Sequence, residues 1–225
     1  MIRQLAFDLP HQEAFSREDF FVSPANAIAL ATVDTWQTWP LGKLLLIGPA
    51  GSGKSHIAHI WAQETGGTII SARRLAQADL PDLAASPYVA VEDAHEVAGM
   101  RAAEPALFHL HNLVVPQGRL LITAQTPARD WGIVLPDLRS RMDAAHVARI
   151  GAPDDALLSA VLIKLFADRQ ISVSPTLIPY IVGRMERTIS AARRLVNRLD
   201  SLSLALGKPV TRALTASLLD SLEDE

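Results

Sequence analysis

The stretch Gly48-Pro-Ala-Gly-Ser-Gly-Lys-Ser55 decides the fold of this 225-residue chain. It matches the pattern G-x-x-x-x-G-K-[S/T], a glycine-rich loop whose backbone N–H groups cradle phosphates. An apolar run at residues 44–47 precedes the loop, and a helical pattern follows it at about 55–65. The surrounding sequence therefore predicts the strand, loop and helix that this motif requires.

The residue types in the loop predict what it binds. The Lys54 ammonium reaches β- and γ-phosphates, and the Ser55 hydroxyl binds Mg²⁺. The N-terminus of the following helix adds a partial positive charge. The alternative is a glycine-rich turn without a ligand. We expect a site for ADP or ATP with Mg²⁺, and its residues are Gly48, Pro49, Ala50, Gly51, Ser52, Gly53, Lys54, Ser55 and His56.

A second motif, Tyr88-Val-Ala-Val-Glu92-Asp93, is an apolar strand that ends in two acids. Beside the loop, such a strand brings both carboxylates to the phosphates. By position, Glu92 binds Mg²⁺ through water and Asp93 orients the attacking water. The usual order in such ATPases is Asp then Glu, so the shorter Asp93 holds the water less well and we expect slow intrinsic hydrolysis. The alternative is a solvated acidic turn.

Short apolar runs alternate with helical patterns through the first 150 residues. The runs are not themselves alternating, which is typical of strands buried on both faces of a parallel sheet. We expect an α/β fold of the P-loop NTPase type, with a five-stranded parallel sheet and helices on both faces. The strand at 120–123 should lie between the loop strand and the acidic strand. The five runs are 44–47, 68–71, 88–92, 120–123 and 145–150.

From residue 151 onward the sequence contains only helical patterns. An α/β domain followed by a small helical lid is the arrangement of AAA+ proteins. The four expected lid helices open at 153–155, at Ser174 as cap with Pro175 in the first helical position, at Thr188 and at Thr211. The expected domains are a tail at 1–15, a nucleotide-binding domain at 16–151 and a four-helix lid at 152–225.

The composition narrows the class of protein. Apolar residues make up 49% of the chain and charged residues 20%, which excludes a disordered chain. The absence of cysteine excludes disulfides, cysteine-bound zinc and thiol catalysis. A net charge of -3 argues against a protein dedicated to binding duplex DNA. Neither a signal sequence nor an apolar run of membrane-spanning length is evident, so we expect a cytoplasmic protein with no membrane partner.

Four features resemble the AAA+ module of the bacterial replication initiator family DnaA, in the order that the family has them. They are Glu18-Asp-Phe-Phe-Val-Ser-Pro-Ala-Asn26, the phosphate loop, the acidic strand and Leu138-Arg-Ser-Arg-Met142. With the helical lid, the resemblance covers nearly the whole chain. It implies that Phe21, Val22 and Asn26 line an adenine pocket, against the alternative that the aromatic side chains pack in a core.

The resemblance also implies that Arg141 is an arginine finger. Such a guanidinium reaches the γ-phosphate bound by a neighbouring subunit and accelerates its hydrolysis by about 10³–10⁵. Arg139 lies two residues away and is the nearest rival for this role. A simple surface arginine is the other alternative.

Two sensor positions depart from the family pattern. After the strand at 120–123, relatives usually carry Asn, Asp or Thr, whereas this chain has Gln125. We expect Gln125 to hydrogen-bond the attacking water, and Thr123 is the alternative for this role. In the lid, Ser190 stands where the sensor arginine belongs, and Arg187, one turn earlier, is the candidate substitute. These departures favour a stable ADP-bound state over rapid turnover.

Within the family, the layout resembles the Hda group, which lacks the DNA-binding domain of DnaA and promotes hydrolysis of DnaA-bound ATP. The stretch Gln4-Leu5-Ala6-Phe7-Asp8-Leu9 resembles the short motif by which proteins dock on the bacterial sliding clamp of DNA polymerase III. Its contacts would be the Gln4 amide and three apolar anchors, Leu5, Phe7 and Leu9. The alternative is an apolar strand packed on the domain.

The resemblance thus implies a negative regulator of replication initiation whose partners are DnaA and the sliding clamp, with no direct sequence-specific DNA binding. It leaves open whether the free protein is a monomer or a homodimer. The main alternative is an AAA+ ATPase of the helicase-loader type, which would grip single-stranded DNA in a salt-sensitive way. A stand-alone P-loop kinase is disfavoured because no second-substrate site is evident.

Overall fold

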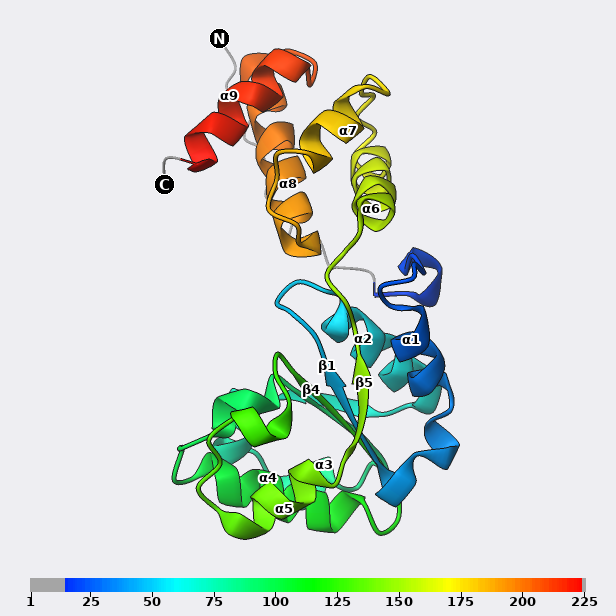
Figure 1. The fold of residues 1–225 in the computed structure, drawn as a ribbon, viewed down its shortest axis with the longest axis vertical. Coiled ribbons are helices and arrows are strands. Elements are labelled where there is room, and N and C mark those ends of the chain that lie inside the picture. Colours follow the sequence, from blue (N-terminus) through cyan, green and yellow to red (C-terminus); the bar gives the residue numbers. More distant parts are fainter. Residues whose placement is uncertain (1–14, 224–225) are drawn as a thin grey trace.

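The computed structural model describes residues 15–223, and of residues 222 and 223 only the backbone. An α/β part and a helical part follow each other along the long axis of the molecule (Figure 1). The residues that carry the expected clamp motif, Gln4, Leu5, Phe7 and Leu9, lie outside the described range. No helix within that range is long and apolar enough to cross a membrane.

Five parallel strands form one sheet: β1 (Lys43–Ile47), β2 (Thr68–Ser71), β3 (Tyr88–Glu92), β4 (Arg119–Ala124) and β5 (His146–Arg149). Their order is β2-β3-β4-β1-β5, so β4 lies between β1 and β3 as the sequence predicted. The predicted strands differ from the observed ones by at most one residue at either end. Because parallel strands end at the same edge, the loop after β1 and the acidic end of β3 come together there, on either side of β4.

The residues of β1 show why this segment becomes a central strand. All five are buried. Leu44 and Leu46 join the apolar cluster on one face of the sheet, and Leu45 and Ile47 join the cluster on the other face. Side chains alternate between the faces of a strand, so a run that is apolar throughout requires cover on both sides.

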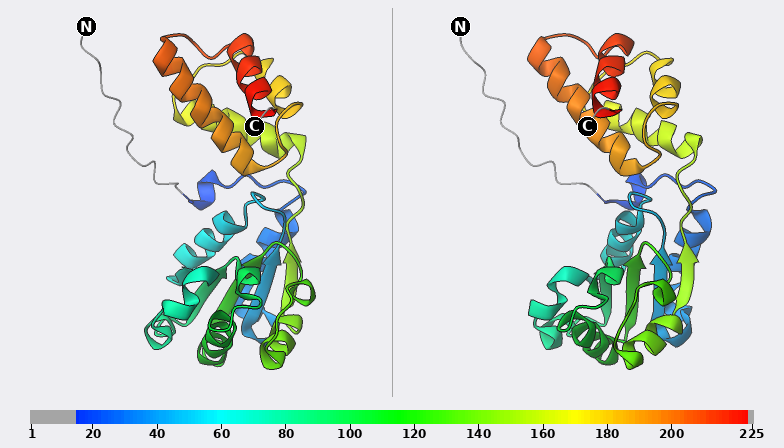
Figure 2. Two further views of the ribbon diagram at one scale, coloured as in Figure 1. Left: turned by 90° about the vertical axis from the view of Figure 1, so that its left-hand side faces the viewer. Right: turned by 60° about the vertical axis from the view of Figure 1, so that its left-hand side comes forward.

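Helices provide that cover (Figure 2). On one face lie α1 (Ala27–Asp34) and α2 (Lys54–Thr65), and on the other lie α3 (Leu80–Leu83), α4 (Ala103–Val114) and α5 (Pro136–Asp143). The α/β part therefore has three layers, with the sheet between two layers of helices, as expected. Short 3-10 helices occur between these elements at η1 (Arg17–Asp19), η2 (Trp36–Thr38), η3 (Pro40–Gly42), η4 (Ala72–Gln77), η5 (Ala94–Val97) and η6 (Ala128–Asp130).

The helical part consists of α6 (Asp155–Asp168), α7 (Leu177–Val182), α8 (Ile189–Leu206) and α9 (Arg212–Glu223), packed around an apolar cluster of its own. Asp154 and Thr188 cap α6 and α8 with their side-chain oxygens. The prediction that Ser174 caps the second helix was wrong, because α7 begins at Leu177. The Ser174 hydroxyl instead contacts Thr176 in the turn before the helix.

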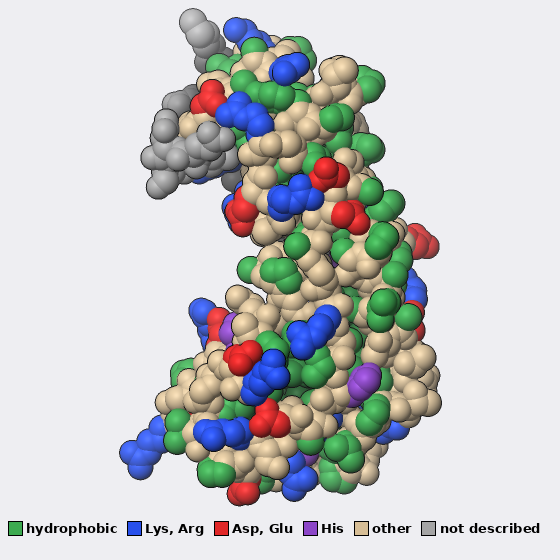
Figure 3. Space-filling model, viewed as in Figure 1, with side chains coloured by type: hydrophobic (Ala, Val, Ile, Leu, Met, Phe, Trp, Pro, Cys, Tyr) green, Lys and Arg blue, Asp and Glu red, His purple; other side chains and the backbone are tan. Residues whose placement is uncertain are grey.

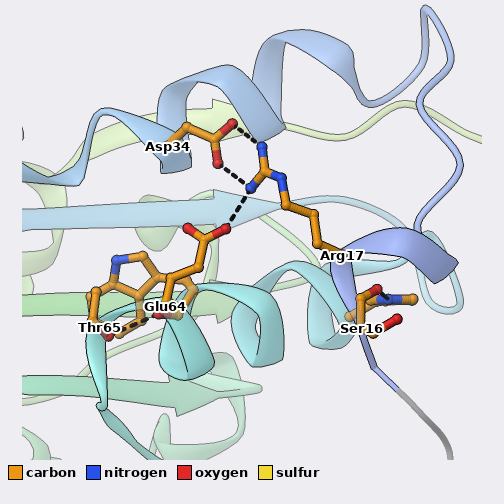
Figure 4. A network of polar contacts seen from close by, with 7 residues as sticks. Ser16, Arg17, Asp34, Glu64 and Thr65 are labelled. Atoms are coloured by element: carbon orange, nitrogen blue, oxygen red, sulfur yellow. Dashed lines mark hydrogen bonds and ion pairs between the residues drawn. The ribbon is translucent and has the colours of Figure 1, made fainter.

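The leading segment, residues 15–26, is attached to the α/β part by an ion-pair network (Figure 4). Arg17 in η1 donates to both carboxylate oxygens of Asp34 at the end of α1, at 2.8 and 2.6 Å. It also donates to Glu64 near the end of α2 at 2.8 Å. The three side chains are partly exposed, so each pair contributes about 0.2–1 kcal/mol. The network joins the segment to α1 and to α2, the helix that follows the phosphate loop.

Candidate nucleotide-binding site

The phosphate loop joins β1 to α2. Two of its glycines hold left-handed backbone angles, Gly51 at φ +67° and Gly53 at φ +102°, which are costly for other residues. Gly53 stands immediately before α2, so the free N–H groups of the first helical turn face the loop. A Cβ at Gly51 would lie 2.5 Å from Ser190 Oγ, so glycine here also lets the helical part approach the loop.

Lys54 is a buried cation at the start of α2. The residue is 7% exposed, and its ammonium donates to the carbonyl oxygens of Gly48 and Pro49, both at 2.9 Å. Burial lowers the pKa of Lys54, and the negative charges of Asp93 and Glu92 oppose that shift. Within residues 15–223 Lys54 forms no direct ion pair. A phosphate bound in the loop would supply the missing anion.

Two buried side-chain atoms beside the loop, Ser52 Oγ and Glu92 Oε1, lack a hydrogen-bond partner among the described residues. Buried polar atoms in proteins nearly always have a partner, so these two fit a ligand of the loop. Glu92 and the exposed Ser55 hydroxyl together fit Mg²⁺. No group of three or more His, Asp or Glu forms a metal-binding cluster in the described part of the chain. Mg²⁺ held by one carboxylate and by phosphates needs no such cluster.

The ends of β3 and β4 meet beside the loop. Asp93 follows β3 in a left-handed conformation, φ +53°, and its N–H donates to Thr123 Oγ1 at 3.0 Å. Since the Thr123 oxygen accepts this bond, its own proton remains available to another acceptor. Gln125, the residue favoured from the sequence, is exposed in the loop after β4 and forms no side-chain hydrogen bond with the described residues. Thr123, the alternative to Gln125 for this sensor position, is therefore the side chain that contacts the end of the acidic strand.

The leading segment carries two exposed apolar side chains, and the residue before them, Phe20, lies 3.6 Å from the position of a Cβ at Gly53. Phe21 and Val22 are 47% and 52% exposed. Asn26 is buried: its Oδ1 accepts from the Ser23 N–H at 2.9 Å, and its Nδ2 donates to the Phe21 carbonyl at 3.0 Å. Asn26 therefore shapes the turn that carries Phe21 and Val22, since both its amide oxygen and its amide nitrogen bond to the backbone of this segment.

His56, expected near the nucleotide, connects α2 to the leading segment. Its Nε2–H donates to the Ser16 carbonyl at 2.9 Å. Burial lowers the pKa of His56, that hydrogen bond opposes the shift, and the charge of Arg193 lowers the pKa further. Arg193 comes from α8 in the helical part, and its guanidinium lies 5.9 Å from the centre of the Phe15 ring.

Sequence reasoning assigned Arg193 no role at this site. A usable signal was present, because Arg193 lies four residues after Ile189, the first residue of α8, and residues four apart share a helix face. The Ile189 N–H donates to the Gly51 carbonyl at 3.0 Å. The face of α8 that begins at Ile189 therefore turns toward the loop and brings Arg193 to the first turn of α2.

The two lid positions considered from the sequence lie apart from each other. Arg187 pairs with Asp155 at 2.6 Å and donates to the Pro153 carbonyl at 3.4 Å, so its guanidinium is engaged where α6 begins. Ser190 faces the loop, next to Gly51 and 3.1 Å from the Thr188 hydroxyl. A small hydroxyl thus lies against the loop at the position that the sequence resemblance assigns to a sensor arginine.

Arg139 and Arg141 both lie on α5 but differ in their surroundings. The Arg139 guanidinium donates to the Ile133 carbonyl. Arg141 is exposed and forms no hydrogen bond or ion pair with residues 15–223. Burial lowers the pKa of Lys43, the first residue of β1, and the charge of Arg141 lowers it further. Arg141 therefore lies toward the Lys43 end of β1, opposite to the phosphate loop, and the strand separates its two ends by roughly 13 Å. Figure 1 shows α5, the helix that carries Arg141, at the end of the α/β part away from the helical part.

A separate groove of about 550 Å³ lies between α6 and α7. Its lining is mainly apolar and includes Ile163, Phe166 and Ile178. Figure 3 shows apolar side chains along that flank of the helical part. No residue of the phosphate loop or of the acidic strand lines it, so the groove is separate from the phosphate site.

Comparison with known proteins fits this geometry. No family model matches the chain. In sequence it is 27% identical over 227 residues to the chromosomal replication initiator protein DnaA of Caulobacter sp. (strain K31), covering 89% of this chain and 47% of the relative. In structure it matches domain III of the Thermotoga maritima replication initiation protein DnaA with a TM-score of 0.80 at 16% identity, covering 95% of this chain and 98% of that one. The chain has a DnaA-like AAA+ domain.

The DnaA-like domain also matches AMPPCP-bound DnaA from Aquifex aeolicus, with a TM-score of 0.66 at 16% identity, covering 81% of this chain and 63% of that one. The chain spans about half the length of the curated relatives that it matches, 47% and 49% in two cases. These comparisons confirm the predicted fold.

Proposed function

We propose that the DnaA-like domain binds ADP or ATP with Mg²⁺ at the phosphate loop. The buried Lys54 ammonium without an ion pair and the unpartnered Glu92 oxygen support this. The exposed Phe21 and Val22 side chains offer an apolar surface for the adenine base. The relative from Aquifex aeolicus is a protein bound to AMPPCP. Bound Mg²⁺, held by Ser55 and Glu92, would neutralise charge on the phosphates.

Hydrolysis in this site is slow. Asp93 is shorter than the glutamate usual at this position, so it orients the water less firmly. The Thr123 hydroxyl, which accepts from the Asp93 N–H, helps to fix the position of that acid. The domain's own Arg141 lies near the other end of β1 and cannot stabilise charge on its own nucleotide.

The placement of Arg141 carries the functional proposal. An exposed guanidinium without a partner in residues 15–223, far from its own phosphate loop, is suited to a phosphate held by another subunit. Arg139, the rival, is occupied by the Ile133 carbonyl. We infer that Arg141 acts as a finger on ATP bound to DnaA and stimulates its hydrolysis. The domain is thereby a negative regulator of replication initiation.

In this scheme the stretch from Gln4 to Leu9 docks the protein on the sliding clamp, with Gln4, Leu5, Phe7 and Leu9 as contacts. Docking concentrates the regulator near DNA without contacts of its own to a base sequence. The net charge of -3 agrees with an indirect route to DNA.

The finger is tested by measuring phosphate release from ATP-bound DnaA in the presence of the clamp loaded on DNA. Arg141→Ala should lower the stimulated rate at least a hundredfold and leave ADP affinity unchanged. Arg129→Ala is the matched control, because Arg129 is an exposed arginine on η6. If the Arg141→Ala variant stimulated hydrolysis as strongly as the Arg129→Ala control, the proposed function would be wrong.

Docking is tested by clamp pull-down with the full chain and with residues 1–10 removed. Binding should require those residues, and Phe7→Ala should weaken it strongly. Clamp binding that survives the deletion would overturn the docking assignment. ATP hydrolysis that responds to single-stranded DNA and not to the clamp would favour the helicase-loader alternative.

A further inference from the structure

A buried carboxylate on α4 binds the start of α5, the helix that carries Arg141. Glu104 is 4% exposed, which is rare for a glutamate. Its Oε2 accepts from the Leu135 N–H at 2.7 Å and from the Val134 N–H at 3.1 Å, and its Oε1 accepts from the same Val134 N–H at 3.0 Å. Leu135 is the residue immediately before α5. The bond between Glu104 and Leu135 joins segments that lie 31 residues apart in the sequence.

The start of α5 has no cap of its own. The N-terminal N–H groups of a helix lack partners within the helix and carry partial positive charge, so a carboxylate is favourable there. The Leu135 side chain has no oxygen to accept from them, and Pro136, the first residue of α5, has no N–H. Glu104 therefore supplies the cap from a neighbouring helix, and α4 and α5 lie side by side (Figure 1).

The helix α4 is a firm support for this contact. Leu107 of α4 is fully buried in the same apolar cluster as Leu138 and Met142 of α5. The Glu104 Oε1 atom also accepts from the Gly99 N–H at 2.7 Å, in the loop before α4. Because α5 has only eight residues, it is too short to be stable without tertiary contacts. The direction of α5 therefore depends on its contacts with α4.

The bonds to Glu104 favour its charged form. In the described part of the chain its carboxylate accepts only from backbone N–H groups. Burial raises its pKa, but these donors, together with the charge of Arg139, outweigh burial and lower the pKa below the usual 4.5. The donors of a buried ion have to point at it, so the ion allows fewer arrangements of the backbone than an apolar side chain would. The start of α5 is therefore held in one place.

We propose that Glu104 is a positioning residue for the finger: by fixing the start of α5, it sets the direction in which Arg141 reaches the terminal phosphate of a partner's nucleotide. Asp137, the acid one turn before Arg141, is exposed on α5 itself. Asp137 therefore moves together with the finger and cannot fix the helix relative to the sheet. This inference rests on the proposed function.

The decisive variant is Glu104→Gln, which keeps the volume of the side chain and places an amide group against the N–H donors. The assay follows a single turnover of ATP bound to DnaA, with the clamp loaded on DNA, as the regulator is titrated to saturation. The saturating rate should fall about tenfold, because a guanidinium displaced by about 1 Å can lose up to about a hundredfold in rate. The half-saturating concentration should stay close to that of the wild type.

A merely structural role for Glu104 would give the opposite pattern. Partial unfolding lowers the concentration of active protein, so the half-saturating concentration would rise while the saturating rate stayed at the wild-type value. That pattern would overturn the inference. Glu18→Gln, which changes an exposed carboxylate in η1, is the matched control and should equal the wild type in both quantities.

Leu135→Pro tests the same contact from the other side. Proline removes the N–H that bonds Glu104 Oε2, and Leu135 already has a φ of -71°, which proline adopts. Leu135→Ala keeps that N–H and is the control, because both variants lose the leucine side chain. The saturating rate should be about tenfold lower with proline than with alanine.

Equal saturating rates in the two Leu135 variants would contradict the inference. If neither Glu104→Gln nor Leu135→Pro folded, Glu104 would be a structural residue and the inference would also be wrong.

Arg141→Ala in the same assay separates the two proposals. If Arg141→Ala is inactive while Glu104→Gln reaches the wild-type saturating rate, the inference about Glu104 fails and the proposed function stands. If Arg141→Ala stimulates normally, the proposed function fails and the inference falls with it.

Discussion

The Ile189 N–H donates a hydrogen bond to the Gly51 carbonyl at 3.0 Å, so the first residue of α8 is bonded directly to the phosphate loop. Ser190 lies on the same side, against Gly51. The helical part is therefore in contact with the element that would hold the phosphates. A change at this contact should alter nucleotide binding and the seating of the helices together.

Gly51→Ala should disrupt this contact. An alanine at φ +67° costs about 1–2 kcal/mol, and its Cβ would meet Ser190 Oγ at 2.5 Å. We expect ADP affinity, measured by fluorescence titration, to fall at least tenfold. Gly99→Ala is the control, since Gly99 has φ +74° with nothing within 4 Å of a Cβ. It should lose stability but keep ADP affinity; equal affinities in the two variants would contradict the prediction.

Removal of Mg²⁺ should weaken nucleotide binding through Glu92. In the wild type, EDTA is expected to lower the affinity for ADP by about tenfold, since Mg²⁺ held by Ser55 and Glu92 would neutralise charge on the phosphates. Glu92→Gln should bind ADP with nearly the same affinity with and without Mg²⁺. Glu96→Gln is the control, because Glu96 is paired with Arg73 on the surface. A Mg²⁺ response in Glu92→Gln as large as in the wild type would show that Glu92 does not bind the ion.

Glu104 should be a major contributor to stability. Its carboxylate is 4% exposed and accepts from the N–H groups of Gly99, Val134 and Leu135 at 2.7–3.1 Å. Glu104→Gln places amide protons against these donors, so the free energy of unfolding in urea should fall by about 2–3 kcal/mol. Glu18→Gln, on the surface, should change it little.

The pH dependence of unfolding follows from the same carboxylate. Burial alone would raise the pKa of Glu104, but the backbone N–H donors outweigh it and the pKa is lowered from 4.5. A lowered folded-state pKa stabilises the fold above the unfolded value and loses that effect as the pH falls through the folded value. The wild type should thus lose stability below about pH 4.5. The curve for Glu104→Gln should be flatter in that range; identical slopes would rule out the assignment.

Arg17→Ala should have a small effect. Its ion pairs with Asp34 and Glu64 are partly exposed, so we expect a loss of about 0.5–1 kcal/mol that shrinks in high salt. A double-mutant cycle with Asp34→Ala measures the pair itself. Coupling of several kcal/mol would mean that the leading segment is attached far more firmly than exposed ion pairs allow.

The sequence by itself determined the fold and the loop that is the candidate phosphate site. Residues 44–47 are apolar on both faces, which requires helices on both sides of the strand. The glycines and Lys54 of the loop follow at fixed short spacing, so their chemistry can be read without knowing distant contacts. Asp154 and Thr188 act on their own helical turns, so the helix starts predicted at 153–155 and at Thr188 also follow from local sequence.

Only the tertiary structure decided which residues from distant segments meet. Arg139 and Arg141 look alike in sequence, but one is bound by the Ile133 carbonyl and the other is exposed. Thr123 reaches Asp93 because β4 lies next to β3, and Lys43 reaches His111 across 68 residues. Such pairs depend on strand order and on helix packing over the sheet. Local spacing fixes which groups the chain carries, whereas the packing of the sheet and its helices fixes which of them come close enough to interact.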